Sequence, residues 1–439
     1  GSARTPPLVK LGAFGTGLGG RGWKGRRHIV LFILLIMCSY GALMPAPAAA
    51  GTHPLPTTGR LHTLTLYSPA LHGFTRVNVL LPIGYAQSRR RYPVLYLLHG
   101  FTNSYASWAA NTDLVHFARP FAIIIVMPDG GNGWYINDAD GGPRWEDYHM
   151  HQLIPFIDSH YRTIANRTDR AIAGLSMGGF GALSYAARHP DLFSAAASFS
   201  GALDVEHLPA LGFGIAAAFG VQNTWLRIEN SPAELAPNLK TLQLLYMATG
   251  TGNAGFLDRG KESQGTGAVE AALYPGFLRT VAAFQAAGIR PIAQVFSPGT
   301  HSWPYWQRDL HQALPLIAAV FRRHVPAPLT WTYKTGATVS GVWGYHFIIA
   351  RKAGTNGFVT ISGVTTHGFM VTGVGRLTVT TAAVYQPGRV YQLRWDRRVL
   401  GRVTATRVGG LTFSLPAANA GITDILSIQM IAFGSKGTG

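Results

Sequence analysis

The sequence nearly lacks cysteine, since Cys38 is the only one among 439 residues. A single cysteine cannot form a disulfide within the chain. Cys38 also lies in an N-terminal segment that we expect to be removed on export, so the mature protein would hold no thiol for nucleophilic attack or metal binding. A chain of this length buries enough apolar surface to fold without disulfides.

The apolar run at residues 29–37 is shorter than the roughly 20 residues that span a bilayer. Four basic residues at 21–27 precede this run, and the small-residue stretch 46–50 follows it. This order predicts a secretory signal peptide at residues 1–50. The alternative is an uncleaved N-terminal membrane anchor. Both alternatives predict that the rest of the chain is secreted or lies in the cell envelope, outside the cytoplasm.

Acidic residues are scarce, with 19 Asp and Glu against 37 Lys and Arg. Of the net charge of +18, residues 1–50 carry +6, residues 326–439 carry +9 and residues 51–325 only +3. The basic region 326–439 would attract an anionic cell-wall polymer or a membrane surface; the alternative is a merely solvated surface. We expect no nucleic-acid partner, because no recognition motif accompanies the charge. Metal-ligand spacings, phosphate loops and dinucleotide fingerprints do not occur in the sequence, so we expect no metal and no cofactor.

Residues 51–325 alternate apolar strands with helical stretches, which predicts an α/β fold. Strands are expected at 60–67 and 75–81, which form an antiparallel pair, and then at 93–98, 122–127, 170–173, 242–248 and 292–296. Helices are expected at 146–161, 179–188 and about 269–287. A proline-containing linker at 325–328 precedes short runs rich in Val, Thr, Tyr and Phe. These runs predict a separate, smaller all-β domain at 326–439, built like a sandwich.

The segment Gly174-Leu175-Ser176-Met177-Gly178 follows one predicted strand and precedes a predicted helix. This context fits the G-x-S-x-G nucleophile elbow of the α/β-hydrolase fold, in which the serine occupies a strained turn. Residues 51–325 are therefore predicted to be an α/β-hydrolase domain with Ser176 as nucleophile. The alternative is a glycine-rich turn that only resembles the motif.

A serine nucleophile needs a histidine base that a carboxylate orients, and in this fold the chain order is serine, acid, histidine. His301 follows the last predicted strand in a turn-rich loop and is the predicted base. The acid should follow the strand at 242–248, where the loop 249–265 offers Asp258 and Glu262. We favour Asp258, because it lies nearer the strand, although each carboxylate is also explained as a solvated loop charge.

Backbone N–H groups are expected to hold the oxyanion of the reaction. His99-Gly100-Phe101 follows a buried strand and resembles an oxyanion loop, so we assign this role to the N–H groups of Phe101 and Met177. Trp108 and Trp303 are candidates for lining a substrate pocket. Aromatic residues in such loops are also ordinary packing residues.

Four segments resemble the esterase family that includes the antigen 85 mycolyltransferases, feruloyl and acetyl-xylan esterases, and S-formylglutathione hydrolases. They are Tyr92-Pro93-Val94-Leu95-Tyr96-Leu97-Leu98-His99-Gly100, Ala173-Gly174-Leu175-Ser176-Met177-Gly178-Gly179, Ser200-Gly201-Ala202-Leu203-Asp204 and Gly299-Thr300-His301-Ser302-Trp303-Pro304-Tyr305-Trp306. The resemblance implies an α/β-hydrolase fold and catalytic roles for Ser176 and His301.

Two departures from the mycolyltransferase pattern limit what the resemblance implies. Ala254 follows Gly250-Thr251-Gly252-Asn253, where mycolyltransferases have a glutamate. Phe101-Thr102-Asn103 lacks the arginine that mycolyltransferases use for trehalose, so trehalose specificity is not implied.

Three functions remain open at this point. The first is a secreted serine esterase that acts on an ester or acyl-sugar substrate. The second is an acyltransferase, similar to the mycolyltransferases, with a sugar or cell-wall acceptor. The third is a noncatalytic cell-surface binding protein on a hydrolase scaffold.

Overall fold

The computed structural model describes residues 60–209, 212, 214–258, 263–396, 398–418 and 423–430. The predicted leader at 1–50 lies outside these residues, as does Glu262. A search of the described helices finds none with the length and apolarity that crossing a membrane requires.

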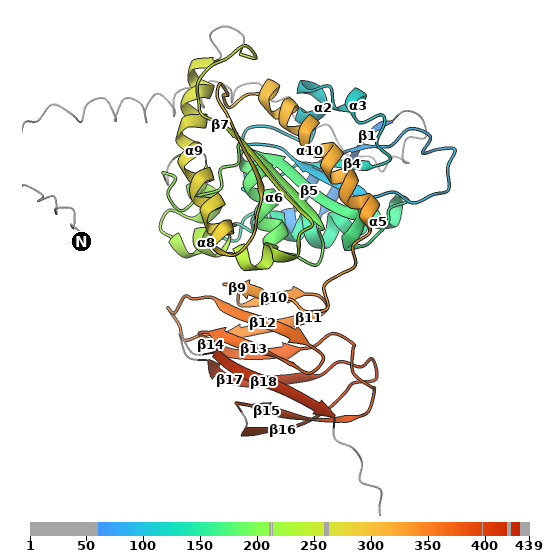
Figure 1. Cartoon of the computed structure of the whole chain (residues 1–439), viewed down its shortest axis with the longest axis vertical. Helices are drawn as coiled ribbons and strands as arrows, with labels where there is room; N and C mark the ends of the chain where they lie inside the picture. The colour runs from blue at the N-terminus through green and yellow to red at the C-terminus, as the bar shows by residue number, and fades with distance from the viewer. Residues whose placement is uncertain are drawn as a thin grey trace, which may run out of the picture. The chain divides into compact units, whose positions relative to one another are not determined.

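One eight-stranded sheet organises residues 60–323 (Figure 1). Its strands, in spatial order, are β1 (Leu61–Ser68), β2 (Gly73–Leu80), β4 (Ile124–Pro128), β3 (Val94–Leu98), β5 (Arg170–Leu175), β6 (Ala195–Phe199), β7 (Leu244–Gly250) and β8 (Ile292–Phe296). Strand β2 runs antiparallel to β1 and β4, and the other pairs are parallel. The carboxyl ends of the parallel strands therefore meet at one edge, where α/β folds place their ligands.

The helices are α2 (Ser107–Asn111), α3 (Leu114–Phe117), α4 (Trp145–Asp147), α5 (Ile154–His160), α6 (Met177–Arg188), α7 (Ile215–Phe219), α8 (Thr224–Glu229), α9 (Ser263–Ala286) and α10 (Trp303–Arg323). A π-helical turn at Tyr148–Leu153 joins α4 to α5, so the helix predicted at 146–161 is present with a local irregularity.

Helices α10 and α6 lie on opposite faces of the sheet. Successive strand residues point to opposite faces, and the two helices contact alternate residues of the central strands. Ala171 and Ala173 of β5 share a core with Leu310 and Leu314 of α10. On the other face, Gly179 of α6 approaches Ser198 of β6 so closely that a Cβ there would lie 2.6 Å from Ser198 Oγ. The nucleophile helix is thus fixed against the sheet by a contact that only glycine permits.

Residues 333–430 form two antiparallel sheets. The four-stranded sheet has the order β10 (Val339–Val342), β11 (Tyr345–Ala350), β14 (Gly375–Thr380), β17 (Thr412–Ala418), and the six-stranded sheet the order β16 (Arg398–Thr404), β15 (Val390–Trp395), β18 (Thr423–Met430), β13 (Gly368–Gly373), β12 (Val359–Thr365), β9 (Tyr333–Thr335). Buried and exposed residues alternate along β11. Phe347 and Val379 of the first sheet share one core with Ile361 and Val371 of the second. The predicted all-β, sandwich-like region is confirmed.

Strand β9 is hydrogen-bonded to the end of α6. Buried Asn238 accepts from the Lys334 N–H at 2.6 Å and donates to the carbonyls of Lys334 at 2.8 Å and Ala187 at 2.9 Å. The Tyr333 hydroxyl donates to the carbonyl of Arg188 at 3.1 Å. The last carbonyls of a helix have no partner within it. These contacts therefore cap the C-terminal end of α6. They also connect the residues before and after 325/326, where the domain boundary stays a prediction.

Asn238→Ala should lower the free energy of unfolding by about 3 kcal/mol, since it leaves three backbone groups, the Lys334 N–H and the carbonyls of Lys334 and Ala187, without their partner. Tyr333→Phe, which removes one donor, should cost about 1 kcal/mol. Urea denaturation measures both values. Lys334→Gln is the control, because it keeps the backbone contacts with Asn238 and removes only side-chain contacts, the ion pair with the partly exposed Glu234 and the cation–π contact with Phe358. It should cost about 1 kcal/mol. Equal stability of Asn238→Ala and the wild type would contradict the capping role.

Candidate active site

Ser176 lies between β5 and α6, with φ 52° and ψ −120°. A positive φ is uncommon for a residue with a side chain and costs about 1–3 kcal/mol unless the surroundings impose it. Here two glycines allow the turn. A Cβ on Gly174 would lie 2.2 Å from the Gly178 carbonyl oxygen, and one on Gly178 would lie 2.4 Å from the His99 carbonyl oxygen. The turn therefore holds the serine hydroxyl at the carboxyl edge of the sheet.

His301 follows β8, and its Nε2 lies 2.8 Å from Ser176 Oγ. Its ring meets the Trp306 ring edge to face, with the centroids 4.9 Å apart. The structure thus brings together the two residues that the sequence selects as nucleophile and base, although they are 125 positions apart. A neutral imidazole at this distance can accept the serine proton through Nε2, provided that Nδ1 carries a hydrogen.

Glu270, on α9, holds the other side of the His301 ring. Its carboxylate accepts from His301 Nδ1 at 2.6 Å, from Thr249 Oγ1 at 2.9 Å and from the Gly250 N–H at 2.5 Å. The side chain is 0% exposed. Burial by itself raises the pKa of Glu270, but the hydrogen bond and charge of His301, with further hydrogen bonds from Gly250 and Ser200, hold this pKa below its usual value. The charged carboxylate fixes hydrogen on Nδ1, which leaves Nε2 to accept from Ser176.

The prediction that Asp258 orients His301 is wrong. Its carboxylate accepts from Thr300 Oγ1 at 2.5 Å, from Tyr305 OH at 2.7 Å and from the Gly255 N–H at 2.6 Å. The loop after β7 places Asp258 against Thr300, the residue before His301. Helix α9, which follows this loop, places Glu270 against the imidazole ring of His301. Glu262, the other candidate, lies outside the described residues.

Sequence reasoning missed Glu270 because it restricted the acid to the loop after β7. One signal was available, since Glu270 is the only carboxylate in the helix predicted at 269–287. A lone acid in an apolar helix directly after the correct strand is a candidate for a buried, paired role.

The loop after β3 lies against the nucleophile. A Cβ on Gly100 would lie 3.3 Å from Ser176 Cβ and 2.5 Å from Leu175 Cδ1. His99 fixes this loop, because its Nδ1 lies 2.8 Å from the Gly100 carbonyl oxygen and its Nε2 accepts from the Gly130 N–H at 2.8 Å. Phe101 follows in this loop and Met177 begins α6, so both residues lie beside Ser176 in the structure. Their role as oxyanion donors stays a prediction.

The two tryptophans assigned to substrate binding have different surroundings. Trp108 is 1% exposed, and its indole N–H donates to the Leu98 carbonyl at 2.9 Å. This burial contradicts a role in substrate binding, because the side chain offers a substrate no surface. Trp303 is half-buried at the start of α10, with its ring centroid 5.1 Å from that of Trp306, which contacts His301. Its role in substrate binding stays a prediction.

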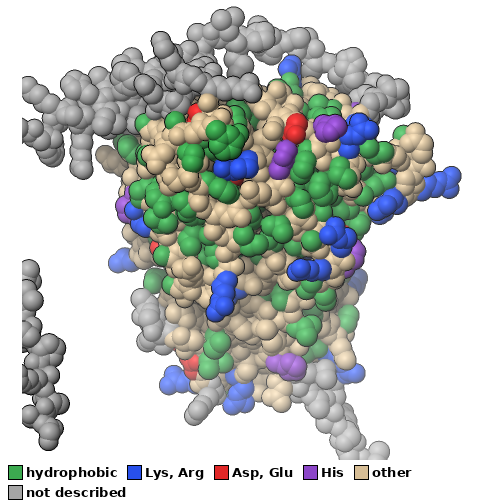
Figure 2. All heavy atoms as spheres, turned by 45° about the horizontal axis from the view of Figure 1, so that its top comes forward, with side chains coloured by type: hydrophobic (Ala, Val, Ile, Leu, Met, Phe, Trp, Pro, Cys, Tyr) green, Lys and Arg blue, Asp and Glu red, His purple; other side chains and the backbone are tan. Residues whose placement is uncertain are grey.

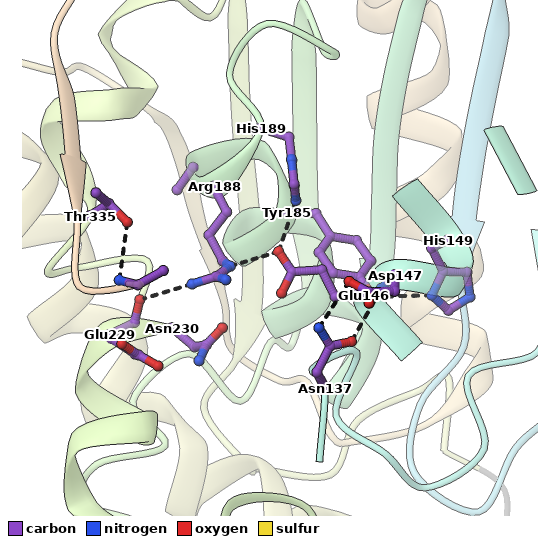
Figure 3. Close-up of polar contacts among 12 residues, drawn as sticks. Asn137, Glu146, Asp147, His149, Tyr185, Arg188, His189, Glu229, Asn230 and Thr335 are labelled. Carbon is purple, nitrogen blue, oxygen red and sulfur yellow. Dashed lines mark hydrogen bonds and ion pairs between the residues drawn. The ribbon is translucent and has the colours of Figure 1, made fainter. Parts of the chain in front are cut away.

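A second polar cluster, largely buried, lies at the C-terminal end of α6 (Figure 3). The length of α6 puts it about 18 Å from Ser176 along the helix. Glu146 Oε1 lies 2.8 Å from Arg188 Nε and 2.8 Å from His189 Nε2. Burial raises the pKa of Glu146, but the charges and hydrogen bonds of Arg188 and His189 outweigh it and hold the pKa well below the usual value. The cluster is therefore a charged pair inside the fold, and its distance from Ser176 assigns it to structure rather than to the reaction.

A sheet in the order β1-β2-β4-β3-β5-β6-β7-β8, with a strained serine after β5, a carboxylate after β7 and a histidine after β8, defines the α/β-hydrolase fold. The comparison with protein families agrees. The model of the esterase family, described as "Putative esterase", matches residues 68–317. The chain belongs to this family, as its sequence segments predict.

Three similar proteins illustrate the relationship. Esterase MT1326 of Mycobacterium tuberculosis (strain CDC 1551 / Oshkosh) is 50% identical over 133 residues, 28% of this chain and 28% of that protein. The diacylglycerol acyltransferase/mycolyltransferase Ag85A of Mycobacterium ulcerans is 31% identical over 248 residues, 51% of this chain and 72% of that protein. A solved ferulic acid esterase has a TM-score of 0.50 and 27% identity, and the match covers 60% of this chain and 98% of its own. The chain spans little more than a quarter of the length of the M. tuberculosis esterases that it matches.

Proposed function

We propose that this protein is a serine esterase that cleaves carboxylic esters through an acyl-enzyme on Ser176. The observation that carries the proposal is the continuous chain of hydrogen bonds from Ser176 through His301 to the buried carboxylate of Glu270. Membership of the esterase family supports the same reaction class.

In the proposed mechanism, Ser176 Oγ attacks the ester carbonyl while His301 Nε2 takes its proton. Glu270 stabilises the resulting imidazolium, and the N–H groups of Phe101 and Met177 hold the oxyanion. The tetrahedral intermediate then expels the alcohol, which receives the proton from His301. This leaves an acyl ester on Ser176. A water activated by His301 then attacks the acyl ester, releases the acid and restores the serine hydroxyl.

Acyl transfer is the second candidate, because a relative that is 31% identical is named as an acyltransferase and mycolyltransferase. It needs the same acyl-enzyme, with the hydroxyl of a sugar or cell-wall acceptor in place of water. A labelled acyl donor distinguishes the two, since transfer predicts that the label moves to an added sugar faster than it appears as free acid. A noncatalytic binding role would leave the hydrogen-bonded Ser176, His301 and Glu270 without a use.

The proposed location is extracytoplasmic, either secreted or in the cell envelope. On the face that Figure 2 shows, Lys and Arg side chains are prominent and Asp and Glu side chains are sparse. Such a surface attracts negatively charged molecules of the cell envelope. The positive charge of residues 326–439 would hold the enzyme near an anionic cell-wall polymer or membrane surface.

A fluorophosphonate probe should label the wild type at Ser176, because a histidine-activated serine attacks the phosphorus as it attacks an ester. Mass spectrometry of the digested adduct locates the label. Ser176→Ala should lose the label. Its turnover of nitrophenyl esters should fall to the small residual rate that the oxyanion hole and substrate binding alone support. Ser184→Ala is the control, because Ser184 lies on the same helix but inside the core. Labelling that survives in Ser176→Ala would overturn the proposal.

A further inference from the structure

Arginine is concentrated along one edge of the C-terminal region. Of the eleven Lys and Arg in residues 326–439, six are arginines at 389–407. Strand β16 stands at the end of the six-stranded sheet, so its outer side is an edge. Arg398 and Arg402 lie on β16, and Arg407 lies in the loop that follows it; all three are exposed. The charge is therefore collected on one strand and its adjoining loop.

Exposed aliphatic side chains lie among these arginines. Val399 and Leu400 follow Arg398 on β16 and are 56% and 38% exposed. Val408 follows Arg407 and is 75% exposed. Val384, which is 50% exposed, is in a neighbouring loop, because the Tyr385 N–H donates to the Gly409 carbonyl at 3.0 Å. We call the set the basic–apolar edge: Val384, Arg398, Val399, Leu400, Arg402, Arg407 and Val408.

The carboxylates of the region do not neutralise this edge. Residues 326–439 hold two acids, Asp396 and Asp424. Asp396 lies in the turn between β15 and β16. It accepts from the Ile425 N–H of β18 at 2.8 Å and is hydrogen-bonded to Asp424 of β18, so the two acids contact each other and β18. Among the described residues, no ion pair involves Arg398, Arg402 or Arg407. The three guanidinium groups are therefore available to external anions.

From these observations we infer that the basic–apolar edge binds an anionic lipid surface. Arginines near such a surface are attracted to its negative headgroups. Aliphatic side chains beside them gain by entering the boundary between headgroups and acyl chains, as at other interfacial sites. A soluble anionic polymer would satisfy the arginines but would give no reason for exposed aliphatic residues at both ends of the same edge, Val399 and Leu400 at one end and Val384 and Val408 at the other. The inference rests on the proposed extracytoplasmic location and deepens it, because it names the residues that bind and selects a lipid surface over a polymer. It does not depend on what Ser176 does.

The test is co-sedimentation of the full chain with phosphatidylcholine vesicles that contain or lack phosphatidylglycerol. All variants carry Ser176→Ala, so that lipid esters are not cleaved, and all share the same residues 1–59. Arg398→Gln with Arg402→Gln should weaken binding to the anionic vesicles roughly 25-fold at low salt, about five-fold for each arginine. Val399→Ser with Val408→Ser should weaken it several-fold without any change of charge.

The matched controls lie on other parts of the same region. Lys352→Gln with Arg376→Gln removes two exposed charges, and Val339→Ser changes a valine that is 68% exposed on β10. Both controls should bind like the parent. The inference is overturned if the charge control loses as much binding as the arginine pair. It is also overturned if the valine pair binds vesicles normally while the arginine pair loses binding to soluble poly-glutamate, since the ligand would then be a polymer.

Discussion

Glu270→Ala should lower kcat for ester turnover by about 10³- to 10⁴-fold. It should also lower the urea midpoint, because it leaves the buried Gly250 N–H and Thr249 hydroxyl without their acceptor, so kcat is measured in buffer without urea. Without the carboxylate, nothing on the Glu270 side selects hydrogen on Nδ1 of His301, and the imidazolium that forms in the reaction loses its nearest opposite charge. Glu270→Gln should be nearly as slow, because an amide keeps the shape but not the charge. Turnover of a nitrophenyl ester, measured under saturating substrate, gives the values.

Asp258→Ala is the control for this experiment. Asp258 is nearer than Glu270 to the end of β7 in sequence, but it contacts Thr300 rather than His301. It removes hydrogen bonds that hold the loop before His301, and it should slow turnover by about ten-fold or less. A loss in Asp258→Ala equal to that in Glu270→Ala would contradict the assignment. So would more than a tenth of the wild-type kcat in Glu270→Ala.

The acid shows where sequence reasoning about the site stops. Ser176 and His301 can be found because Ser176 directly follows β5 in a recognisable motif and His301 lies in the short loop after β8, where the fold places the base. Glu270 is 20 residues beyond the end of β7, and its place depends on how closely α9 approaches the sheet. That approach is set by Gly252 and Gly267, since a Cβ on Gly267 would lie 2.5 Å from the Gly252 carbonyl oxygen. Contacts of this kind appear only in three dimensions.

The strands follow a similar division. Apolar β-branched runs predicted β4 and β8 within two residues of their observed bounds. Strand β6 was not predicted, because its sequence Ala-Ala-Ala-Ser-Phe has little β preference by itself. In the fold, the small side chains of Ala195–Phe199 are buried on both faces, where α10 and α6 pack closely against the centre of the sheet. Packing between neighbours therefore decides this element, and local preference does not.

The polar cluster around Glu146 is equally invisible in sequence, because its members come from separate segments at 146 and 188–189 (Figure 3). A largely buried arginine that loses its nearest carboxylate, as Arg188 would, loses most of its compensation, although the charge of Glu229 still acts on it. Breaking such a buried pair costs about 3–5 kcal/mol. We therefore expect Glu146→Ala to lower the free energy of unfolding by about 4 kcal/mol at neutral pH. Glu146→Gln should cost less, because the amide oxygen still accepts from Arg188. Asp113→Ala, at a partly exposed pair with His311, should cost less than about 1 kcal/mol.

The effect of Glu146→Ala should also depend on pH with a definite sign. The folded-state pKa of Glu146 lies below the unfolded value of about 4.3, so the carboxylate stabilises the fold above that pH. This stabilisation is lost as the pH falls from about 4 toward the folded-state pKa, and the difference between wild type and Glu146→Ala should shrink over the same interval. Urea denaturation at neutral pH and at about pH 3 measures both differences. A difference that stays constant with pH would mean that Glu146 contributes packing and not charge, and that Arg188 is neutralised by another group.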